Sequence, residues 1–201
     1  MKVYLSIDLD YWGCYSGSLR SDMLRTSKRT ATNIRAINTP VDILTVISHE
    51  ELLQHVNASG CDVLVNVDYH NDIVDNKWTR DRKPGEGNWV NYVRWAPVGT
   101  YVWIYRNVVE GACDDECFTT SMLVKNTGWK NIVYRDRLIL PWGSVTHIGI
   151  AVSPSYILYP ENIDSDLLQI TGQFASDQVN AKLSSIFGDI TYETHNHNTK
   201  Q

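Results

Sequence analysis

The sequence predicts an α/β protein in which helices cover both faces of a mostly parallel β-sheet, a three-layer α/β/α arrangement. Short apolar, β-branched runs alternate with longer polar-faced segments in the order strand, helix, strand, helix, strand up to Asp68. Each of these apolar runs ends at polar residues, as buried parallel strands do. The 201 residues, 43% hydrophobic and 20% charged, are enough for one sizeable core. We therefore predict a single domain spanning residues 1–201.

The first part of the chain contains three predicted strands and two predicted helices. The first helix covers residues 21–37, where strand alternation is absent. The second helix begins after Ser48, because Glu51 follows three residues later in the spacing of a capping box. The three strands lie at residues 3–7, 41–47 and 61–67.

The second part of the chain opens with a loop rich in charge, glycine and tryptophan at residues 76–95. Loops of this length in compact domains are usually functional or disordered. We expect His147 to be a core imidazole whose hydrogen bonds are satisfied, and the tail that holds His195 and His197 to be frayed and outside any site. Three further strands are predicted at residues 101–105, 131–140 and 144–152, and a capped helix at residues 162–174.

Charge and hydropathy exclude several functional classes. The chain has 18 Lys and Arg against 23 Asp and Glu, a net charge of −5, which argues against a nucleic-acid-binding surface. No uncharged apolar run reaches the roughly 18 residues of a membrane span. The opening MKVYLSIDLDYW has two aspartates too early for a signal peptide. We expect a soluble cytoplasmic protein that binds neither nucleic acid nor membrane, with its four cysteines as free thiols.

Six ionisable side chains follow the first three predicted strands. Because the carboxyl ends of parallel strands meet at one edge of a sheet, we expect these side chains to lie close together. Alternate residues of an extended chain share a face, so we also expect the side chains within each motif to point the same way. The six are Asp8 and Asp10 after the first strand, His49 after the second, and Asp68, His70 and Asp72 after the third.

Such a set predicts a site for two metal ions. Four aspartates brought together without a cation would repel one another, and their pKa values would rise. Two divalent cations balance four carboxylates, and an oxygen-rich set with two imidazoles suits Mn²⁺ better than Zn²⁺. Two cations about 3.5–4 Å apart can share a hydroxide, because a bound cation lowers the pKa of water. Each motif is a weak signal alone, and the prediction depends on their joint occurrence at successive strand ends.

The same motifs resemble those of one enzyme family. VNVDYHNDI resembles the DAHxD metal motif of the arginase and agmatinase ureohydrolases, and LSIDLD resembles their S-x-D-x-D motif. ILTVISHEEL resembles the strand and histidine of their GGDH motif, without its glycines. In arginases the histidine comes first, whereas here S-x-D-x-D leads. This order, the small size and the opening SIDLDYW look most like the peptide arginases of ribosomal peptide maturation, which convert arginine side chains of a precursor peptide to ornithine.

The resemblance covers about the first half of the chain and implies an arginase-like fold with two Mn²⁺ ions. It also implies a role for each of the six residues: two of them bridge the metals and the other four complete one metal or the other. The bridging positions fall on Asp8 and Asp68, the remaining ligands of one metal on His49 and Asp72, and those of the other on His70 and Asp10.

The predicted activity is hydrolysis of an arginine guanidinium to ornithine and urea, with an arginine-containing precursor peptide as partner. A planar guanidinium that is always charged needs a carboxylate, and Glu86 is the candidate. GEGNWVNY is similar to the arginase substrate loop with S-G-N-L-H, but has Glu86 in place of the serine and no matching histidine. Asp72 is the predicted proton carrier to the leaving amine. Asn88 and Trp89 are predicted to bind substrate, and other aromatic residues between 78 and 103 to line a peptide groove.

Three other interpretations stay open. A single-zinc deacetylase would use Asp68, His70 and one more aspartate, but would leave His49, Asp10 and Asp72 without a role. A hydrolase of a small guanidino compound such as agmatine would keep the same metal site. A binding module without activity would use the acidic site to hold a cationic peptide or a structural ion.

Overall fold

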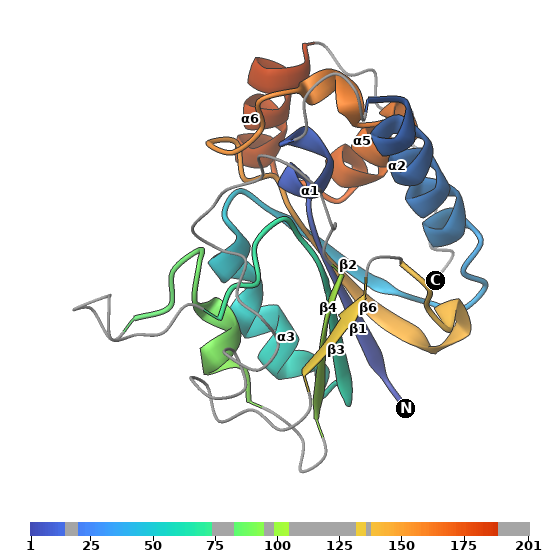
Figure 1. Cartoon of the computed structure of the whole chain (residues 1–201), viewed down its shortest axis with the longest axis vertical. Coiled ribbons are helices and arrows are strands. Elements are labelled where there is room, and N and C mark those ends of the chain that lie inside the picture. Colours follow the sequence, from blue (N-terminus) through green and yellow to red (C-terminus); the bar gives the residue numbers. More distant parts are fainter. Residues whose placement is uncertain (15–19, 74–82, 95–98, 105–131, 136–137, 189–201) are drawn as a thin grey trace, which may run out of the picture.

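The computed structural model describes residues 1–14, 20–73, 83–94, 99–104, 132–135 and 138–188. Across these residues six strands form one parallel sheet in the order β2-β6-β1-β3-β4-β5. Helices cover both faces of the sheet (Figure 1), which confirms the predicted three-layer α/β/α class. None of the described helices is long and apolar enough to cross a lipid bilayer.

The observed strands confirm the predicted ones to within a few residues, except that only part of the segment 131–140 is described. The strands are β1 (Val3–Asp8), β2 (Asp42–Val46), β3 (Val63–Val67), β4 (Thr100–Ile104), β5 (Ile132–Arg135) and β6 (Val145–Ala151). The helices are α1 (Asp10–Gly13), α2 (Arg20–Arg35), α3 (Leu53–Ser59), α5 (Ser165–Gln173) and α6 (Asp177–Phe187). The 3₁₀ turns in the described part of the chain are η2 (His49–Leu52), η3 (Trp89–Tyr92), η4 (Trp142–Ser144) and η5 (Pro160–Asn162).

Two of the helices were not predicted. Helix α6 has Ser176 as its N-cap, whose side chain accepts the Val179 N–H, and it buries Val179 and Leu183 on one face. Both signals are present in the sequence: a serine suited to cap a helix, and apolar residues four positions apart. Together they identify the helix. The short helix α1 directly follows β1 and buries Trp12.

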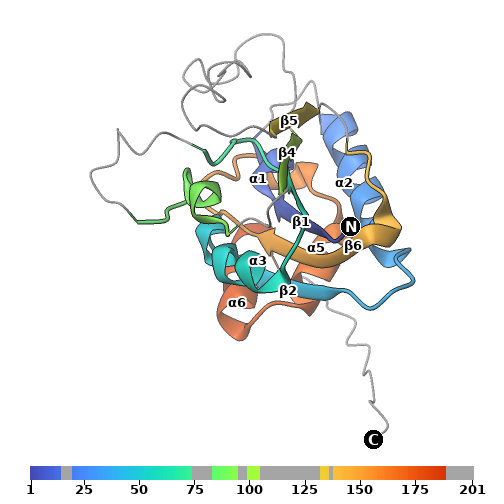
Figure 2. The same ribbon diagram turned by 90° about the horizontal axis from the view of Figure 1, so that it is seen from below.

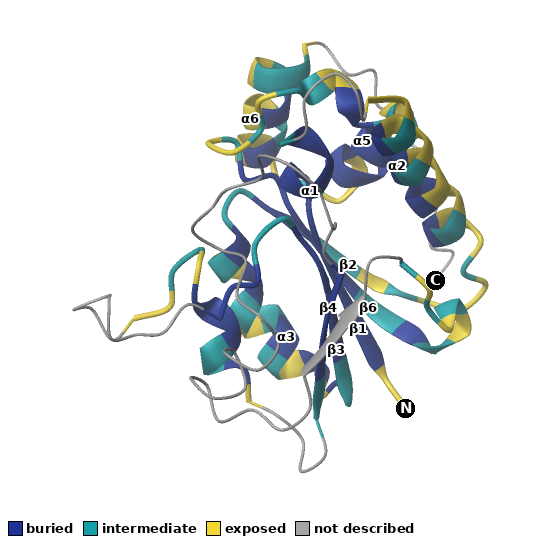
Figure 3. Cartoon of the chain, in the orientation of Figure 1, coloured by how far each residue is buried: buried dark blue, intermediate teal, exposed yellow. Residues whose placement is uncertain are grey.

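Strand β1 lies inside the sheet and is buried along its whole length (Figure 3). Its alternate residues enter two different cores. Val3, Leu5 and Ile7 pack in the cluster that includes residues of α2, α5 and α6, whereas Tyr4 packs in the cluster that includes residues of α3 and η3. The continuous apolar run at the start of the sequence therefore reflects a strand that is covered by helices on both faces.

The order in which the chain adds strands to the sheet reverses beside β1. The chain leaves β1 through α2 to reach β2 at one edge of the sheet, then returns through α3 to β3 on the other side of β1 (Figure 2). Strand β6 later inserts between β2 and β1. Parallel sheets bind ligands beyond the carboxyl ends of their strands, at the point where the strand order reverses. The functional site is therefore expected beyond the ends of β1 and β3.

Candidate metal centre

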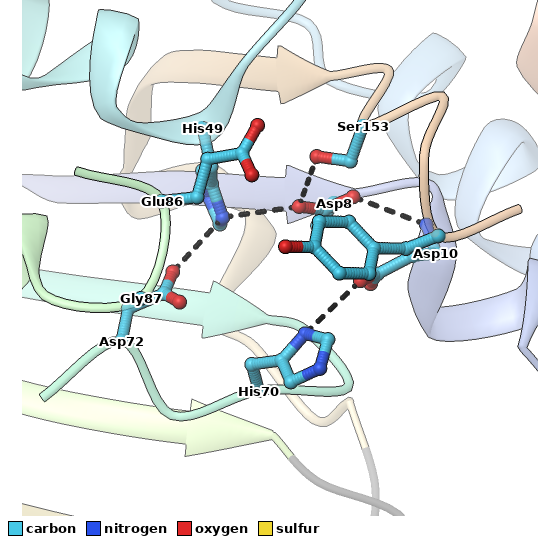
Figure 4. Close-up of a pocket in the computed structure, with 9 residues that line it drawn as sticks. Asp8, Asp10, His49, His70, Asp72, Glu86, Gly87 and Ser153 are labelled. Carbon is cyan, nitrogen blue, oxygen red and sulfur yellow. Dashed lines mark hydrogen bonds and ion pairs between the residues drawn. The ribbon is translucent and has the colours of Figure 1, made fainter. Parts of the chain in front are cut away.

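The six ionisable residues predicted from the sequence do converge at the carboxyl edge of the sheet. A cavity of about 120 Å³ opens there, lined by ends of strands and by two loops (Figure 4). Its lining residues are Asp8, Asp10, His49, His70, Asp72, Glu86, Gly87, Ser153 and Tyr156. Asp68, the sixth predicted residue, is buried beside them and contacts both histidines.

One group of carboxylates surrounds His49. The Nδ1 atom of this histidine lies 3.2 Å from Asp8 Oδ2, 3.0 Å from Asp68 Oδ2 and 3.0 Å from Asp72 Oδ2. All four side chains are buried. The ring nitrogen of His49 and the carboxylates of Asp8 and Asp68, from three different strand ends, form a set of donors suited to one divalent cation, and Asp72 adjoins this set through His49.

A second group adjoins the first through Asp68. His70 Nδ1 lies 3.1 Å from Asp10 Oδ2 and 3.8 Å from Asp68 Oδ1. Asp68 therefore turns one oxygen toward each histidine, so its carboxylate would be shared between the two groups if both held a metal. Asp8, the other predicted bridge, contributes Oδ2 to the His49 group, while its Oδ1 accepts the backbone N–H of Asp10 at 3.1 Å.

The backbone brings these side chains together by turns, and the prediction that they share the face of an extended chain was wrong. Strand β1 ends at Asp8, and Leu9 has helical dihedral angles (φ −67°, ψ −20°). Likewise Asp68 lies just beyond β3, and its Oδ1 accepts the N–H of His70 at 2.7 Å. An aspartate that accepts the N–H two residues later forms an Asx turn, and such a turn folds the chain back over the strand end.

Backbone strain also concentrates at this site. Among the described residues, Asp72 (φ 53°) and Ser153 (φ 44°) are the non-glycine residues with positive φ, and both line the cavity. Residues other than glycine adopt this conformation at a cost of about 1–3 kcal/mol, and they do so most often at functional sites. Ser153 Oγ donates to Asp8 Oδ2 at 2.6 Å, and Asp72 places its carboxylate against His49.

The electrostatics of the site fit bound cations. Burial, and then the charges of Asp8 and Asp68, raise the pKa of Asp10 well above its ordinary value. Burial, and then the charge of Asp72, raise the pKa of Asp68 to about 8. Burial would lower the pKa of His49, but the surrounding Asp72, Asp68 and Asp8 outweigh burial and raise it. A proton on His49 thus partly neutralises the surrounding carboxylates, as a bound cation would.

Three buried atoms of the site give a direct test of whether metals fit. Among the described residues, His49 Nδ1 and both carboxylate oxygens of Asp10 are enclosed but form no well-aligned hydrogen bond; the contacts of His49 Nδ1 and of Asp10 Oδ2 are ion pairs at 3.0–3.2 Å. Buried polar atoms without hydrogen bonds are rare and costly, because they lose their hydrogen bonds to water. Metal ligation satisfies such atoms, so the donor set fits a binuclear site.

Several residues that sequence reasoning missed hold the ligands in place. Ser6 Oγ pairs with His49 Nε2 at 2.7 Å, which leaves Nδ1 facing the carboxylates. Asn66 Nδ2 donates to Asp68 Oδ2 at 3.1 Å, and Trp103 Nε1 donates to the Asp68 carbonyl at 3.0 Å. Ser6 and Asn66 each stand two positions before a candidate ligand and share its strand face, a signal that could have identified them.

In the loop that was predicted to bind substrate, one residue lines the cavity and another contacts a candidate metal ligand. Glu86 lines the cavity, and its Oε1 accepts a hydrogen bond from Ser48 Oγ at 2.9 Å. Asn88 and Trp89 are not among the cavity-lining residues. Trp89 is fully buried and its Nε1 donates to Asp72 Oδ2 at 2.6 Å, so its contact is with a candidate ligand. The predicted groove residues Trp78 and Trp95 lie outside the described part of the chain.

Replacing Trp89 with phenylalanine is expected to weaken Mn²⁺ binding about 10–100-fold, the usual effect of removing an outer partner of a ligand. The aromatic ring stays in its buried position, but Asp72 loses the N–H that orients it. Isothermal titration of the metal-depleted protein with Mn²⁺ measures the change. The matched control is Trp12→Phe, which removes a partly buried indole hydrogen bond to Thr26, in the hydrophobic cluster that does not contain Trp89. Equal metal affinities in both variants would contradict the positioning role of Trp89.

The metal-free protein is expected to be less stable at pH 8 than at pH 6. The pKa of Asp68 rises from 3.8 to about 8 on folding, so the folded state holds this proton more tightly and loses stability as the pH rises between these values. The raised pKa of His49 has the same sign, because its stabilising proton is lost as the pH rises through the folded pKa.

Thermal unfolding in the presence of a chelator, at pH 6 and pH 8, measures this difference. Since one pKa unit corresponds to about 1.4 kcal/mol, the melting temperature should fall by several degrees. Excess Mn²⁺ at pH 8 is expected to restore it, because metal replaces the lost protons. A chelated protein that melts higher at pH 8 would show that the carboxylates do not repel one another as described.

Comparisons of the chain with protein-family models, with curated proteins and with solved structures find no match. Its function must therefore be inferred from the chemistry of the site.

Proposed function

We propose that this protein is a binuclear, Mn²⁺-dependent hydrolase that converts arginine side chains of a peptide to ornithine and urea. The observation that carries the proposal is the pair of ligand groups, Asp8–His49–Asp68 and Asp10–Asp68–His70, that share one buried carboxylate. One metal would lie among His49, Asp8, Asp68 and Asp72, and the other among His70, Asp10 and Asp68. Metal ions in such a site supply Lewis acidity and make water nucleophilic near neutral pH.

Glu86 supplies the charge that a guanidinium needs. It lines the same cavity as the candidate ligands, and the hydrogen bond from Ser48 holds its carboxylate in place. A guanidinium donates two parallel N–H groups to a carboxylate, so Glu86 can both bind the group and orient its plane. Tyr156 also lines the cavity and is 40% exposed, so its ring can pack against the planar cation or its alkyl stem.

Asp72 is suited to move a proton to the leaving amine. Its carboxylate lines the cavity, and the indole of Trp89 and the positive φ of Asp72 itself fix its position. A general acid must reach the departing nitrogen directly or through one water. In the loop where arginases have a histidine this chain has none, so a carboxylate of the site takes that role in the proposed reaction.

The charge of the cavity favours a peptide over free arginine as substrate. None of the described residues that line the cavity is lysine or arginine, so nothing there pairs with the α-carboxylate of a free amino acid. An arginine within a peptide lacks that carboxylate, and the net charge of −5 attracts a cationic peptide. Agmatine also lacks a carboxylate and is the second candidate substrate on this ground.

A test by mass spectrometry separates the candidates. The Mn²⁺-loaded protein is incubated with an arginine-containing peptide, with agmatine and with free arginine, alongside samples that contain a chelator. Loss of CH₂N₂ from the peptide, abolished by the chelator, is the expected result. Loss from agmatine alone would change the substrate class, and no mass change in any sample with two metals bound per chain would refute the hydrolase.

The same samples test the deacetylase alternative. That reading uses one metal and leaves the buried group around His49 without a purpose. An acetyl-lysine peptide added as a fourth substrate is expected to remain unchanged. Its loss of an acetyl group would favour the single-metal reading.

A further inference from the structure

A second group of metal-ligating side chains lies at the opposite edge of the sheet. Asp42 is the first residue of β2, His55 belongs to α3, and His147 belongs to β6. One ligand atom from each lies within 4.8 Å of the other two. The group adjoins Tyr4, which pairs with His147 in the sheet register, four positions before Asp8 on β1. At about 3.3 Å per residue, the two sites are separated by roughly 13 Å of strand, too far for any shared ion.

The contacts within this group are close and specific. His55 Nε2 lies 3.2 Å from Asp42 Oδ2, and the rings of His55 and His147 are 5.5 Å apart in an edge-on arrangement. Asp42 and His147 are direct neighbours in the register of β2 and β6. The side chain of His55 is only 14% exposed, whereas that of Asp42 is 66% exposed. The group is therefore accessible from solvent on one side and fixed by the fold on the other.

Each of the two imidazoles is hydrogen-bonded through its Nδ1 atom to a hydroxyl group. The Tyr4 hydroxyl pairs with His55 Nδ1 at 2.8 Å, and Thr146 Oγ1 pairs with His147 Nδ1 at 2.9 Å. Burial raises the pKa of Tyr4, so its phenol stays neutral and can accept the His55 Nδ1–H. Histidine ligands of metals almost always have their second ring nitrogen hydrogen-bonded, which sets the tautomer that binds through Nε2.

The backbone leaves room for this arrangement at Gly149. A side chain there would overlap the Tyr4 hydroxyl and the Leu52 methyl groups. Burial, and then the nearby His55, lower the pKa of His147, while the charge of Asp42 opposes them. The prediction that His147 lies in the core was wrong, because it is half-buried and faces a second histidine, although its Nδ1 does have a hydrogen-bond partner in Thr146.

We propose that Asp42, His55 and His147 form a separate binding site for a zinc-class divalent cation. Two imidazoles and one carboxylate, with a fourth position open to water, are a common zinc donor set. The oxygen-rich site at the other edge instead suits Mn²⁺. An ion here links the edge strand β2 to α3 and β6, and thereby stabilises the segment from Asp42 to Ser59 that carries His49. The proposal does not depend on the proposed hydrolase activity.

Metal counting on the full chain tests this site. The metal-depleted protein is dialysed against a low concentration of Zn²⁺, and zinc per chain is measured by plasma mass spectrometry. Asp42→Ala and His147→Gln are each expected to retain one zinc fewer per chain than the wild type. The control Asp177→Ala removes an exposed carboxylate on α6 and is expected to retain the wild-type count. Zinc held by His195 and His197 is the same in all four proteins and cancels.

A spectroscopic signal identifies the site that is lost. Co²⁺ in a four-coordinate site with imidazole ligands absorbs visible light strongly, whereas six-coordinate Co²⁺ in an oxygen-rich site absorbs weakly. The strong band is expected in the wild type and in Asp177→Ala, and is expected to be absent from Asp42→Ala. Equal zinc counts and equal Co²⁺ spectra in wild type and Asp42→Ala would overturn the proposal. Because Asp42 is largely exposed, this result decides the matter even if His147→Gln fails to fold.

The activity assay keeps the two proposals distinguishable. Once loaded with Mn²⁺, Asp42→Ala is expected to hydrolyse peptide arginine as the wild type does at moderate temperature. If the wild type shows no hydrolysis, the proposed function fails while the zinc counts still test this second site. If hydrolysis is present but the counts are equal, only the second site is refuted.

Discussion

Replacing Asp68 with asparagine is expected to reduce hydrolysis of peptide arginine by at least about a thousandfold, more than the 10–100-fold typical when an outer partner of a ligand is removed. Asp68 is the carboxylate that faces both histidines, so its loss weakens both metal positions together. Asparagine has nearly the same shape and can still pair with Asn66, which donates to Asp68 in the wild type. Mn²⁺ per chain and turnover of an arginine peptide are the two measurements.

The same variant also separates an enzyme from a binding module. Because the raised pKa of Asp68 marks a carboxylate that the metal-free fold disfavours, Asp68→Asn should melt at least as high as the wild type when both are chelated at alkaline pH. Mn²⁺ should then stabilise the wild type but not the variant. Asp177→Asn provides the same chemical change on an exposed helix position. Hydrolysis that persists in Asp68→Asn would refute the metal mechanism.

Replacing Glu86 with glutamine is expected to lower kcat/KM for an arginine peptide by about 30- to 5,000-fold, with two Mn²⁺ per chain still bound. The change removes the charge that pairs with the guanidinium but keeps a side chain that Ser48 can hold. Loss of one partner of an enclosed, hydrogen-bonded charge pair costs roughly 2–5 kcal/mol, which sets this range. Steady-state kinetics with the peptide and metal analysis of the same sample measure both quantities.

The control for Glu86→Gln is Glu161→Gln, which makes the same change at an exposed position in η5. A citrulline peptide, which carries a neutral ureido group in place of the guanidinium, sharpens the test. As a competitive ligand it should lose little affinity in Glu86→Gln, because it never formed the ion pair. An unchanged kcat/KM for the arginine peptide would assign Glu86 to the loop structure alone.

The sequence alone was sufficient to predict the fold class. The run Val3–Asp8 reads as a strand buried on both faces because β1 has helices on each side, and such strands show no alternation. The stops at Asp8, Ser48 and Asp68 mark the carboxyl ends of three strands, since a buried strand ends where polar side chains begin. Parallel topology then requires those ends to meet, so the candidate ligands could be predicted as one set.

The contacts inside that set depended on local turns that the sequence pattern did not reveal. Asp8 and Asp68 each accept the N–H two residues later, and these bonds turn Asp10 and His70 toward the cavity. An extended chain would give the same pairs a shared face, so the right grouping was predicted for the wrong reason. The positive φ of Ser153 has no signature in residue type, because strain at such a position is maintained by surrounding packing, and that of Asp72 has only the weak signal that aspartate tolerates this conformation.

Long-range packing alone decided the remaining features. Ser153 reaches Asp8 and Trp89 reaches Asp72 across 145 and 17 positions of the chain, and neither contact follows from spacing. The grouping of Asp42, His55 and His147 requires β6 to insert between β2 and β1, and no local sequence pattern predicts this strand order. Residue type and the period of the apolar residues therefore determine which segments form strands and where those strands end. Which side chains meet is determined by the order of the strands and by the turns beyond them, and both depend on the packing of the whole chain.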